Sequence, residues 1–314
     1  MPTAITRVAS LGGGVIGQSW TALFLAAGKT VALFDPDPAA EHRVRKAVTD
    51  AWPTLTALGL AVGEVPSEEL VVCRDARAAV AGADFVQESI PERAHLKHDL
   101  YATIEPALSA STVVASSASG LTLSELQTGW RNPARLVLGH PFNPPHLIPL
   151  VEVMGNTRTA AGVVEQTRAF YESLGKVTIE VKREVPGHVA NRLQAALWRE
   201  AIHLANEGVA SVRDIDTAIS AGPGLRWAVM GPTLLFHLGA GKGGIAAFCE
   251  RYADSFNRWW DDLGEPRLDK ATADRLLAGI FSGDAPDDVE ALTEKRDALL
   301  TGVFAATRDA RPRR

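Results

Sequence analysis

The sequence predicts an α/β protein, in which a doubly wound, mainly parallel sheet with an inserted helical hairpin is followed by an all-helical C-terminal domain. Three observations support this fold class. A strand pattern, a glycine-rich turn and a helix pattern follow one another at the N-terminus, short apolar strands then alternate with helical stretches, and strand patterns stop near residue 185. We therefore expect two domains, residues 1–185 and 186–314, for which a chain of 314 residues is long enough.

The N-terminal pattern consists of a strand over residues 6–11, a helix over residues 18–27 and a second strand over residues 30–34. Further strands are expected at residues 85–88, 112–115, 135–139 and 177–181. Because helical stretches lie between several of them, the sheet should be mainly parallel and covered on both faces.

Two segments depart from simple alternation. Residues 39–70 resemble two helices split near Gly59 and Gly63, and they predict a helical hairpin that projects from the sheet domain. From Val189 onward the pattern is helical, and the first helix, residues 188–207, carries apolar positions on more than one side. Such a helix must be buried within the protein or against another subunit, which favours a homodimer.

The glycine-rich turn has the spacing of a dinucleotide-binding motif. Gly12, Gly14 and Gly17 fit G-x-G-x-x-G, in which the first glycine permits a tight turn, the second admits a pyrophosphate and the third lets helix and strand pack closely. Asp35 ends the second strand, near the offset of roughly 20 residues at which an acid bonds the adenosine ribose. Because its charge should repel a 2'-phosphate, this Rossmann pattern predicts NAD as cofactor. The alternative is a loop that serves packing alone, with Asp35 as a turn cap.

Composition excludes several classes of function. The net charge is −5 and basic residues are scattered apart from the terminal Arg311, Arg313 and Arg314, so we expect no nucleic-acid partner. Cys73 and Cys249 lie far apart without metal-binding spacing, which favours a reducing, cytoplasmic location without a disulfide or a metal. No secretory leader or membrane span is predicted, because no segment approaches the roughly 18 apolar residues that a span needs. Residues 284–288 predict a turn before a last charged helix.

Residues 139–154, GHPFNPPHLIPLVEVM, follow a predicted strand and contain too many prolines for a helix, so we expect a stiff loop. Loops at strand ends are where α/β proteins place their chemistry. Alcohol oxidation needs a base for the hydroxyl proton, and the imidazole of His140, with an ordinary pKa of about 6.5, suits that task. A carboxylate such as Glu152 would hold its tautomer and favour the cation formed in turnover. His146, like the other histidines, is interpreted as structural or pocket-lining.

Six segments resemble, in order and spacing, the L-3-hydroxyacyl-CoA dehydrogenase family: residues 12–17, 116–121, 140–144, 150–152, 187–192 and 230–232. The resemblance runs over nearly the whole chain and weakens after about residue 275. It implies a Rossmann domain, a helical C-terminal dimerisation domain, and NAD-linked interconversion of a 3-hydroxy and a 3-keto group.

Carried over by residue, the resemblance makes His140 the general base and Glu152 its orienting partner, with Ser119 and Asn191 completing the catalytic set. It implies cofactor contacts for Gly12, Gly14, Val15, Ile16, Gly17, Asp35, Glu92, Lys97, Ser117 and Asn143. Each of three residues has an alternative role. Glu152 would form a structural ion pair, and Ser119 would hydrogen-bond the backbone of its own loop, ahead of a helix that residues 122–125 cap. Asn191 would hydrogen-bond the neighbouring backbone.

Two departures from the acyl-CoA enzymes favour a small free acid. Coenzyme A carries phosphates that Arg and Lys normally meet, yet residues 39–70 contain more acidic than basic side chains, the basic ones being Arg43, Arg45 and Lys46. Residues 222–232, GPGLRWAVMGP, are similar to a branch that contains L-carnitine dehydrogenase, L-gulonate 3-dehydrogenase and lambda-crystallin. Arg226 of that segment would clamp a substrate carboxylate, and Trp227, or Trp198 on the preceding helix, would face a quaternary ammonium through a cation–π contact. The alternative places Arg226 in an ion pair across the dimer interface and the tryptophans in the core.

The sequence therefore predicts NAD-dependent oxidation of a small free L-3-hydroxy acid, carnitine-like or gulonate-like, to its 3-keto acid. A short-chain L-3-hydroxyacyl-CoA dehydrogenase is the alternative within the same family. A non-catalytic NAD-binding structural protein, as lambda-crystallin is in the lens, is the alternative of another class; the presence of both His140 and Glu152 argues against it.

Overall fold

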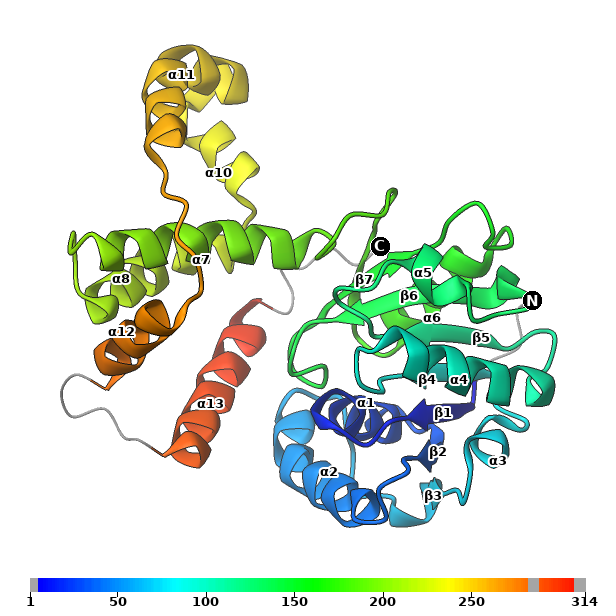
Figure 1. The fold of residues 1–314 in the computed structure, drawn as a ribbon. Helices are drawn as coiled ribbons and strands as arrows, with labels where there is room; N and C mark the ends of the chain where they lie inside the picture. The colour runs from blue at the N-terminus through cyan, green and yellow to red at the C-terminus, as the bar shows by residue number, and fades with distance from the viewer. Residues whose placement is uncertain (1–4, 282–287, 308–314) are drawn as a thin grey trace. The chain divides into compact units, whose positions relative to one another are not determined.

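The computed structural model describes residues 5–281 and 288–307 (Figure 1). The terminal arginines, and the turn expected at residues 284–288 apart from Asp288, lie outside these ranges. The chain divides into two compact units, Met1–Ala190 and Asn191–Arg314. The division thus follows Ala190, a few residues beyond the boundary expected at residue 185.

The first unit contains an eight-stranded sheet in the order β3-β2-β1-β4-β5-β6-β7-β8. Its strands are β1 (Arg7–Leu11), β2 (Thr30–Phe34), β3 (Leu70–Val72), β4 (Phe85–Glu88), β5 (Val113–Ser116), β6 (Leu136–Pro141), β7 (Leu150–Met154) and β8 (Val177–Glu180). Neighbouring strands are parallel except β6 and β7, which are antiparallel. The chain order reverses between β1 and β4, which is the doubly wound topology that the alternation predicted.

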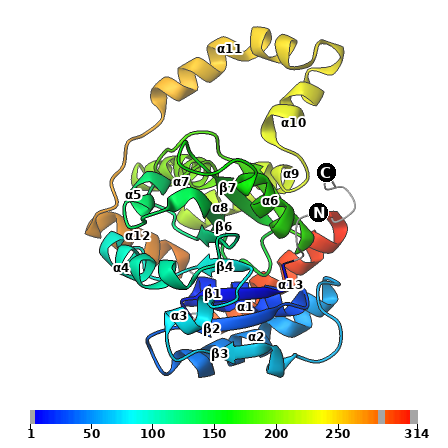
Figure 2. The ribbon, with the colours of Figure 1, turned by 90° about the vertical axis from the view of Figure 1, so that its right-hand side faces the viewer.

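Helices cover both faces of this sheet, as expected for strands that are apolar on both sides. They are α1 (Val15–Ala26), α2 (Ala40–Ala57), α3 (Ala76–Val80), α4 (Ala94–Ile104), α5 (Leu123–Gln127) and α6 (Val163–Ser173), with the 3-10 turns Ser67–Glu69, Glu105–Ala107 and Pro133–Arg135. Figure 2 shows α2 and α3 on opposite sides of β2 and β3. The predicted fold class is confirmed.

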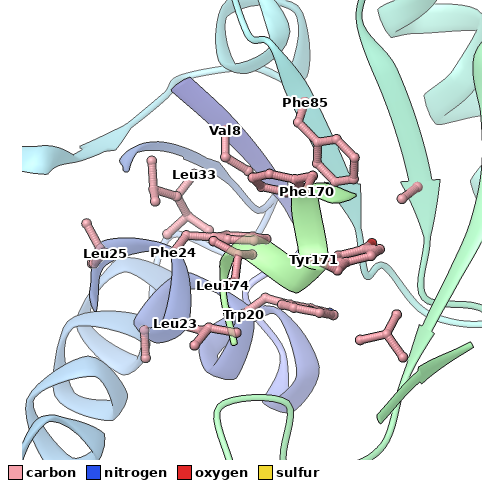
Figure 3. Packing of buried hydrophobic residues seen from close by; sticks show 14 of the residues in the cluster. Val8, Trp20, Leu23, Phe24, Leu25, Leu33, Phe85, Phe170, Tyr171 and Leu174 are labelled. Carbon is pink, nitrogen blue, oxygen red and sulfur yellow. The ribbon is translucent and has the colours of Figure 1, made fainter. Parts of the chain in front are cut away.

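Two apolar clusters fill the spaces between helices and sheet. On one face Trp20 and Phe24 of α1 stack at 5.4 Å between ring centroids and pack with Phe85 of β4 and with Phe170 and Tyr171 of α6 (Figure 3). The other face is filled mainly from α3, α4 and α5, by Val80, Tyr101, Ile104, Leu123, Leu126 and neighbouring side chains. These clusters hold the carboxyl ends of the central strands in one row, where the candidate site lies.

The predicted helical hairpin is wrong in its second half. Residues 39–70 form the single helix α2, whose positions Val44, Val48 and Leu55 are buried at helical spacing, then a loop, a 3-10 turn and the start of β3. Gly59 and Gly63 adopt positive φ of 68° and 73°, a conformation that ends a helix. Helix α2 packs against α1, so it belongs to the layer that covers the sheet.

The stiff loop expected over residues 139–154 is also shorter than predicted, because β6 runs to Pro141 and β7 begins at Leu150. Pro141 ends β6 and Pro149 directly precedes β7, where the missing N–H does not interrupt the ladder, and Pro144 and Pro145 lie in the loop between the strands. Strands β3 and β7 were both absent from the sequence prediction. Only residues 142–149 form the loop between β6 and β7.

The described part of the second unit is helical, as predicted. Its elements are α7 (Ala190–Asn206), α8 (Val212–Ile219), a π-helical turn (Ser220–Gly224), α9 (Leu225–Trp227), α10 (Pro232–Gly239), a 3-10 turn (Gly241–Gly243), α11 (Gly244–Asp262), α12 (Lys270–Ile280) and α13 (Val289–Thr307). Gly222 is non-helical and produces the break expected at residues 222–224. Among the described helices, none combines the length and the apolar character that crossing a membrane requires.

Candidate active site

The glycine turn lies between the end of β1 and helix α1, and it has no room for side chains at two positions. Gly12 has φ of 102°, and a Cβ on it would lie 2.7 Å from the carbonyl oxygen of Ser89. A Cβ on Gly17 would collide with the carbonyl oxygen of Gly12. These contacts are the close helix–strand packing that the G-x-G-x-x-G spacing predicted.

The N-terminus of α1 is suited to a pyrophosphate. No side chain caps it at Gly14, its first turn carries no acidic residue, and the space in the Cβ direction of Gly14 is open. The first intrahelical bond runs from Gln18 N to Gly14 O, so the N–H groups of Val15 and Ile16 precede the helix's own ladder. A helix terminus with free N–H groups and a favourable dipole is a ready site for phosphate, and these residues therefore fit a dinucleotide.

Asp35 lies beside this turn at the end of β2. Its Oδ2 accepts from Gly13 N at 2.7 Å, and its Oδ1 accepts from Asp37 N at 2.8 Å. The carboxylate thus caps the turn, as one of the two sequence interpretations expected. Its contact with the adenosine ribose stays a prediction.

His140 and Glu152 are directly opposite each other in the antiparallel pair β6–β7. His140 Nδ1 lies 2.8 Å from Glu152 Oε2, and the two side chains are buried. Glu152 Oε1 accepts from the backbone N–H groups of Val189 at 2.9 Å and Ala190 at 3.0 Å.

The pKa of Glu152 is lowered. Burial raises it, but the hydrogen bonds from His140, Ala190 and Val189 together outweigh burial. Glu152 is therefore a carboxylate that only accepts hydrogen bonds, so Nδ1 of His140 carries a hydrogen and Nε2 keeps its lone pair. This is the tautomer that a general base requires.

Ser119 completes a chain of three polar groups, because its Oγ lies 3.0 Å from His140 Nε2. It stands in the loop that follows β5, and Glu92 holds that loop: its Oε1 accepts from the N–H groups of Ser119 at 2.8 Å, of Gly120, and of Leu121 at 3.0 Å. Burial raises the pKa of Glu92, and these three N–H groups bring it below its ordinary value. The structure thus shows Glu92 positioning the Ser119 loop, while its predicted cofactor contact stays a prediction.

Two other predicted cofactor residues are Ser117, directly after β5, and Lys97 of α4, whose side chain reaches the carboxyl end of β4. Ser117 Oγ lies 2.9 Å from Ser89 Oγ and accepts from Gln87 Nε2 at 2.9 Å. Lys97 is buried, with its ammonium 2.5 Å from Glu88 Oε1. Because the Lys97 charge is already paired inside the protein, its direct contact with the cofactor stays a prediction.

The carboxylate of Glu88 organises that buried cluster, which sequence patterns did not indicate. Its Oε2 accepts from the hydroxyls of Tyr101 and Ser116, both at 2.7 Å, and its Oε1 also accepts from Ile90 N at 2.9 Å. A buried charge with this many partners is held in one geometry. The cluster therefore supports the strand ends from which the site residues project.

The loop between β6 and β7 is bound to helix α1. Ser19 Oγ accepts from His146 N and lies 2.7 Å from His146 Nδ1. Lys176 donates to the carbonyl oxygens of Pro145 and Ile148, and its ammonium lies 5.4 Å from the centre of the Trp20 ring. Burial lowers the pKa of Lys176 to about 7. The loop that follows His140 is thereby attached to the helix that begins at the glycine turn, while Asn143 within that loop is exposed.

The remaining predicted site residues belong to the second unit. Asn191 stands in the first turn of α7, and Arg226 and Trp227 are exposed residues of the short helix α9. Their predicted contacts with substrate stay predictions. In the first unit, by contrast, the glycine turn, Ser119 and His140 all lie at the carboxyl ends of β1, β5 and β6, along the edge at which the strand order reverses.

This arrangement agrees with comparisons to known proteins. The NAD-binding domain of 3-hydroxyacyl-CoA dehydrogenase matches residues 7–185, and the C-terminal domain of the same family matches residues 187–277. The chain belongs to the 3-hydroxyacyl-CoA dehydrogenase family. As a member of that family it is an NAD-dependent oxidoreductase, and NAD is its cofactor.

Three known proteins are similar to this chain over nearly its whole length. L-carnitine dehydrogenase of Streptomyces coelicolor is 49% identical over 306 residues, which cover 98% of this chain and 96% of that protein. L-carnitine dehydrogenase of Pseudomonas aeruginosa is 43% identical over 311 residues, which cover 99% of this chain and 97% of that protein. Among solved structures, 5-formyl-3-hydroxy-2-methylpyridine 4-carboxylic acid 5-dehydrogenase, an NAD+-dependent dismutase, superposes with a TM-score of 0.85 at 32% identity and covers 97% of this chain and 99% of its own.

Proposed function

We propose that this protein oxidises the hydroxyl group of a small free L-3-hydroxy acid to the 3-keto acid with NAD, and that L-carnitine or a closely similar acid is the substrate. The observation that carries the proposal is the chain Glu152–His140–Ser119 at the carboxyl end of β6. The names of the relatives support the choice of substrate, because carnitine and the pyridine carboxylic acid are both free acids.

In the proposed reaction, His140 Nε2 takes the proton of the substrate hydroxyl. NAD bound at the glycine turn, residues 12–17, would supply the acceptor for the hydride that leaves the carbon bearing this hydroxyl. The resulting imidazolium is stabilised by Glu152, whose carboxylate is itself held by the N–H groups of Val189 and Ala190. Ser119 supplies a neutral hydroxyl beside Nε2, which bonds the oxygen as it changes from hydroxyl to carbonyl, and we assign Asn191 the same task.

The charge of helix α2 favours a free acid over a coenzyme A thioester. Each of its basic side chains already has an acidic partner: Arg43 with Asp37 at 2.8 Å, Arg45 with Glu41 at 2.9 Å, and Lys46 with Asp50 at 2.6 Å. These exposed pairs contribute little to stability, but they neutralise the charges that a polyanion would need.

A substrate panel tests the proposal. Initial rates of NAD reduction are measured with L-carnitine, L-gulonate, 3-hydroxybutyrate and 3-hydroxybutyryl-CoA under the same conditions. We expect the highest kcat/KM for L-carnitine, and a higher value for every free acid than for the thioester. Preferred turnover of 3-hydroxybutyryl-CoA would contradict the proposal and identify the protein as a short-chain 3-hydroxyacyl-CoA dehydrogenase. Preferred turnover of L-gulonate would identify a sugar acid as the substrate.

Arg226 is proposed to hold the substrate carboxylate, with Trp227 next to the trimethylammonium group. Arg226→Ala is expected to raise KM for L-carnitine about tenfold or more, because a charged, bidentate hydrogen bond is lost. KM for NAD should not change. The measurement is steady-state kinetics of this variant, of Arg226→Lys and of the control Arg213→Ala on the exposed side of α8. An unaltered KM for L-carnitine in Arg226→Ala would show that Arg226 does not contact the substrate.

We also propose a homodimer formed through the second unit. Several large apolar side chains of its helices are exposed, among them Leu193, Trp198, Trp259 and Trp260. Large exposed apolar patches mark sites of contact with other molecules, and a second copy of the same chain would cover these side chains. Light scattering should give twice the chain mass of 33.5 kDa, and a mass equal to one chain would contradict the dimer.

A cytoplasmic location is part of the same proposal. Both cysteines, Cys73 and Cys249, are free thiols, and Cys249 is exposed. Free exposed thiols persist in reducing compartments, which is consistent with such a location.

A further inference from the structure

His188 stands at the turn that anchors Glu152. Its backbone has φ of 51°, a left-handed conformation that is uncommon outside glycine. The two residues that follow, Val189 and Ala190, direct their N–H groups at Glu152 Oε1. The backbone conformation of His188 therefore determines how the partner of His140 is held.

The side chain of His188 reaches the other half of the site. Its Nε2 lies 3.2 Å from the carbonyl oxygen of Ala118, immediately before Ser119, and its ring centre lies 5.2 Å from that of His140. The residue as a whole is 2% exposed. His188 thus contacts the Ser119 loop through its ring and supports Glu152 through its backbone.

The contacts of the His188 ring favour its neutral form. Because Ala118 O can only accept, Nε2 must carry the hydrogen, and Nδ1 of the neutral ring then carries a lone pair. Nδ1 is buried and has no hydrogen-bond partner in the described part of the chain, so a proton added there would find no acceptor.

The surroundings of His188 both raise and lower its pKa. Burial lowers its pKa, the bond to Ala118 raises it, the charge of His140 lowers it, and Glu152 and Glu92 raise it; the net effect is a pKa below the ordinary value. At neutral pH the ring is therefore uncharged next to the histidine that becomes positive during oxidation.

We propose that His188 is a positioning residue of the active site: in its neutral form it joins the Ser119 loop to the turn that anchors Glu152, and its protonation opposes the positive charge that His140 acquires on taking the substrate's proton. This inference rests on the proposed role of His140 as general base. It assigns the enzyme a second titrating group that controls the acid side of its pH profile.

Two variants separate the parts of this proposal. His188→Gln places an amide N–H as far along the side chain as Nε2 of His188, so it can still donate to Ala118, but it cannot titrate. His188→Phe keeps a ring and loses both the donor and the titration. His42→Gln, the same change on the exposed side of α2, is the matched control.

Rates of L-carnitine oxidation across the acid range give the first measurement. At low pH, a plot of log(kcat/KM) against pH should approach a slope of two in wild type and in His42→Gln, because both His140 and His188 must be neutral. His188→Gln should approach a slope of one and retain kcat near pH 8 within about threefold, whereas His188→Phe should lose about tenfold in kcat with KM for NAD unchanged. A slope of two in His188→Gln would overturn the proposal, as would equal kcat in His188→Phe and wild type.

A second measurement does not depend on the substrate. The Cε1–H resonance of His140, assigned by its absence in His140→Gln, is followed by NMR as pH changes. In wild type it should show two inflections, one of them from His188, and in His188→Gln only one. If no panel compound is oxidised, the proposed function fails, while this titration still decides whether the two histidines are coupled. Identical His140 titrations in wild type and His188→Gln would contradict the coupling.

Discussion

Replacing His140 with Gln is expected to lower kcat by about 10²- to 10⁴-fold while NAD affinity stays unchanged. His140 Nε2 is the group next to Ser119 whose lone pair takes the hydroxyl proton, and an amide cannot take it. The glycine turn that binds the dinucleotide is formed by other residues, so its function should persist. Steady-state kinetics with the best acid of the panel, together with calorimetric titration of NAD, measure both quantities.

The control for this change is His42→Gln, on the exposed side of α2. Its kcat should equal that of the wild type. A loss smaller than about tenfold in His140→Gln would show that His140 is not the base, because general-base catalysis typically contributes about 10²- to 10⁴-fold. Joint loss of kcat and NAD affinity would instead indicate that His140 supports the cofactor site.

Replacing Glu152 with Gln should lower kcat on the order of 10³-fold, although the new side chain has the same size. The N–H groups of Val189 and Ala190 both need an acceptor, so the amide oxygen of the new residue stays with them and its NH₂ faces His140 Nδ1. The hydrogen of His140 then moves from Nδ1 to Nε2. The ring points the same way but no longer offers a lone pair to the substrate.

Glu180→Gln is the matched control for Glu152→Gln, because Glu180 is an exposed carboxylate on the neighbouring strand β8. It should leave kcat unchanged. Full activity of Glu152→Gln would contradict the tautomer argument and make Glu152 a structural partner only.

The stability of Glu152→Gln adds a test of the carboxylate's charge. Because the folded-state pKa of Glu152 lies below its ordinary value, its contribution to the free energy of unfolding is present above about pH 4.3 and is lost as pH falls through the folded-state pKa. Thermal unfolding should therefore show a wild-type advantage over Glu152→Gln at neutral pH that shrinks below about pH 4. An advantage independent of pH would mean that Glu152 is held without its charge.

Some features of this protein follow from short stretches of sequence. The glycine turn, the strand β2 and the helix after Gly14 were predictable because spacing and local apolar runs determine them within a few residues. The hairpin over residues 39–70 was mispredicted for the same reason: helical composition continues past Gly59, but the turns and the packing of Leu70 into the sheet decide the outcome.

The sequence by itself determined the fold class and the position of the glycine turn, and it indicated His140 and Glu152 as the candidate base and its partner. Only the tertiary structure decided that these two residues are direct partners across the antiparallel strands β6 and β7, since prolines concealed β7. Only the tertiary structure shows that Lys176 donates to the loop between β6 and β7 and that the rings of His188 and His140 are neighbours. Buried polar groups of this kind are selected by partners distant in the chain, and no local pattern of residue types records which partners those are.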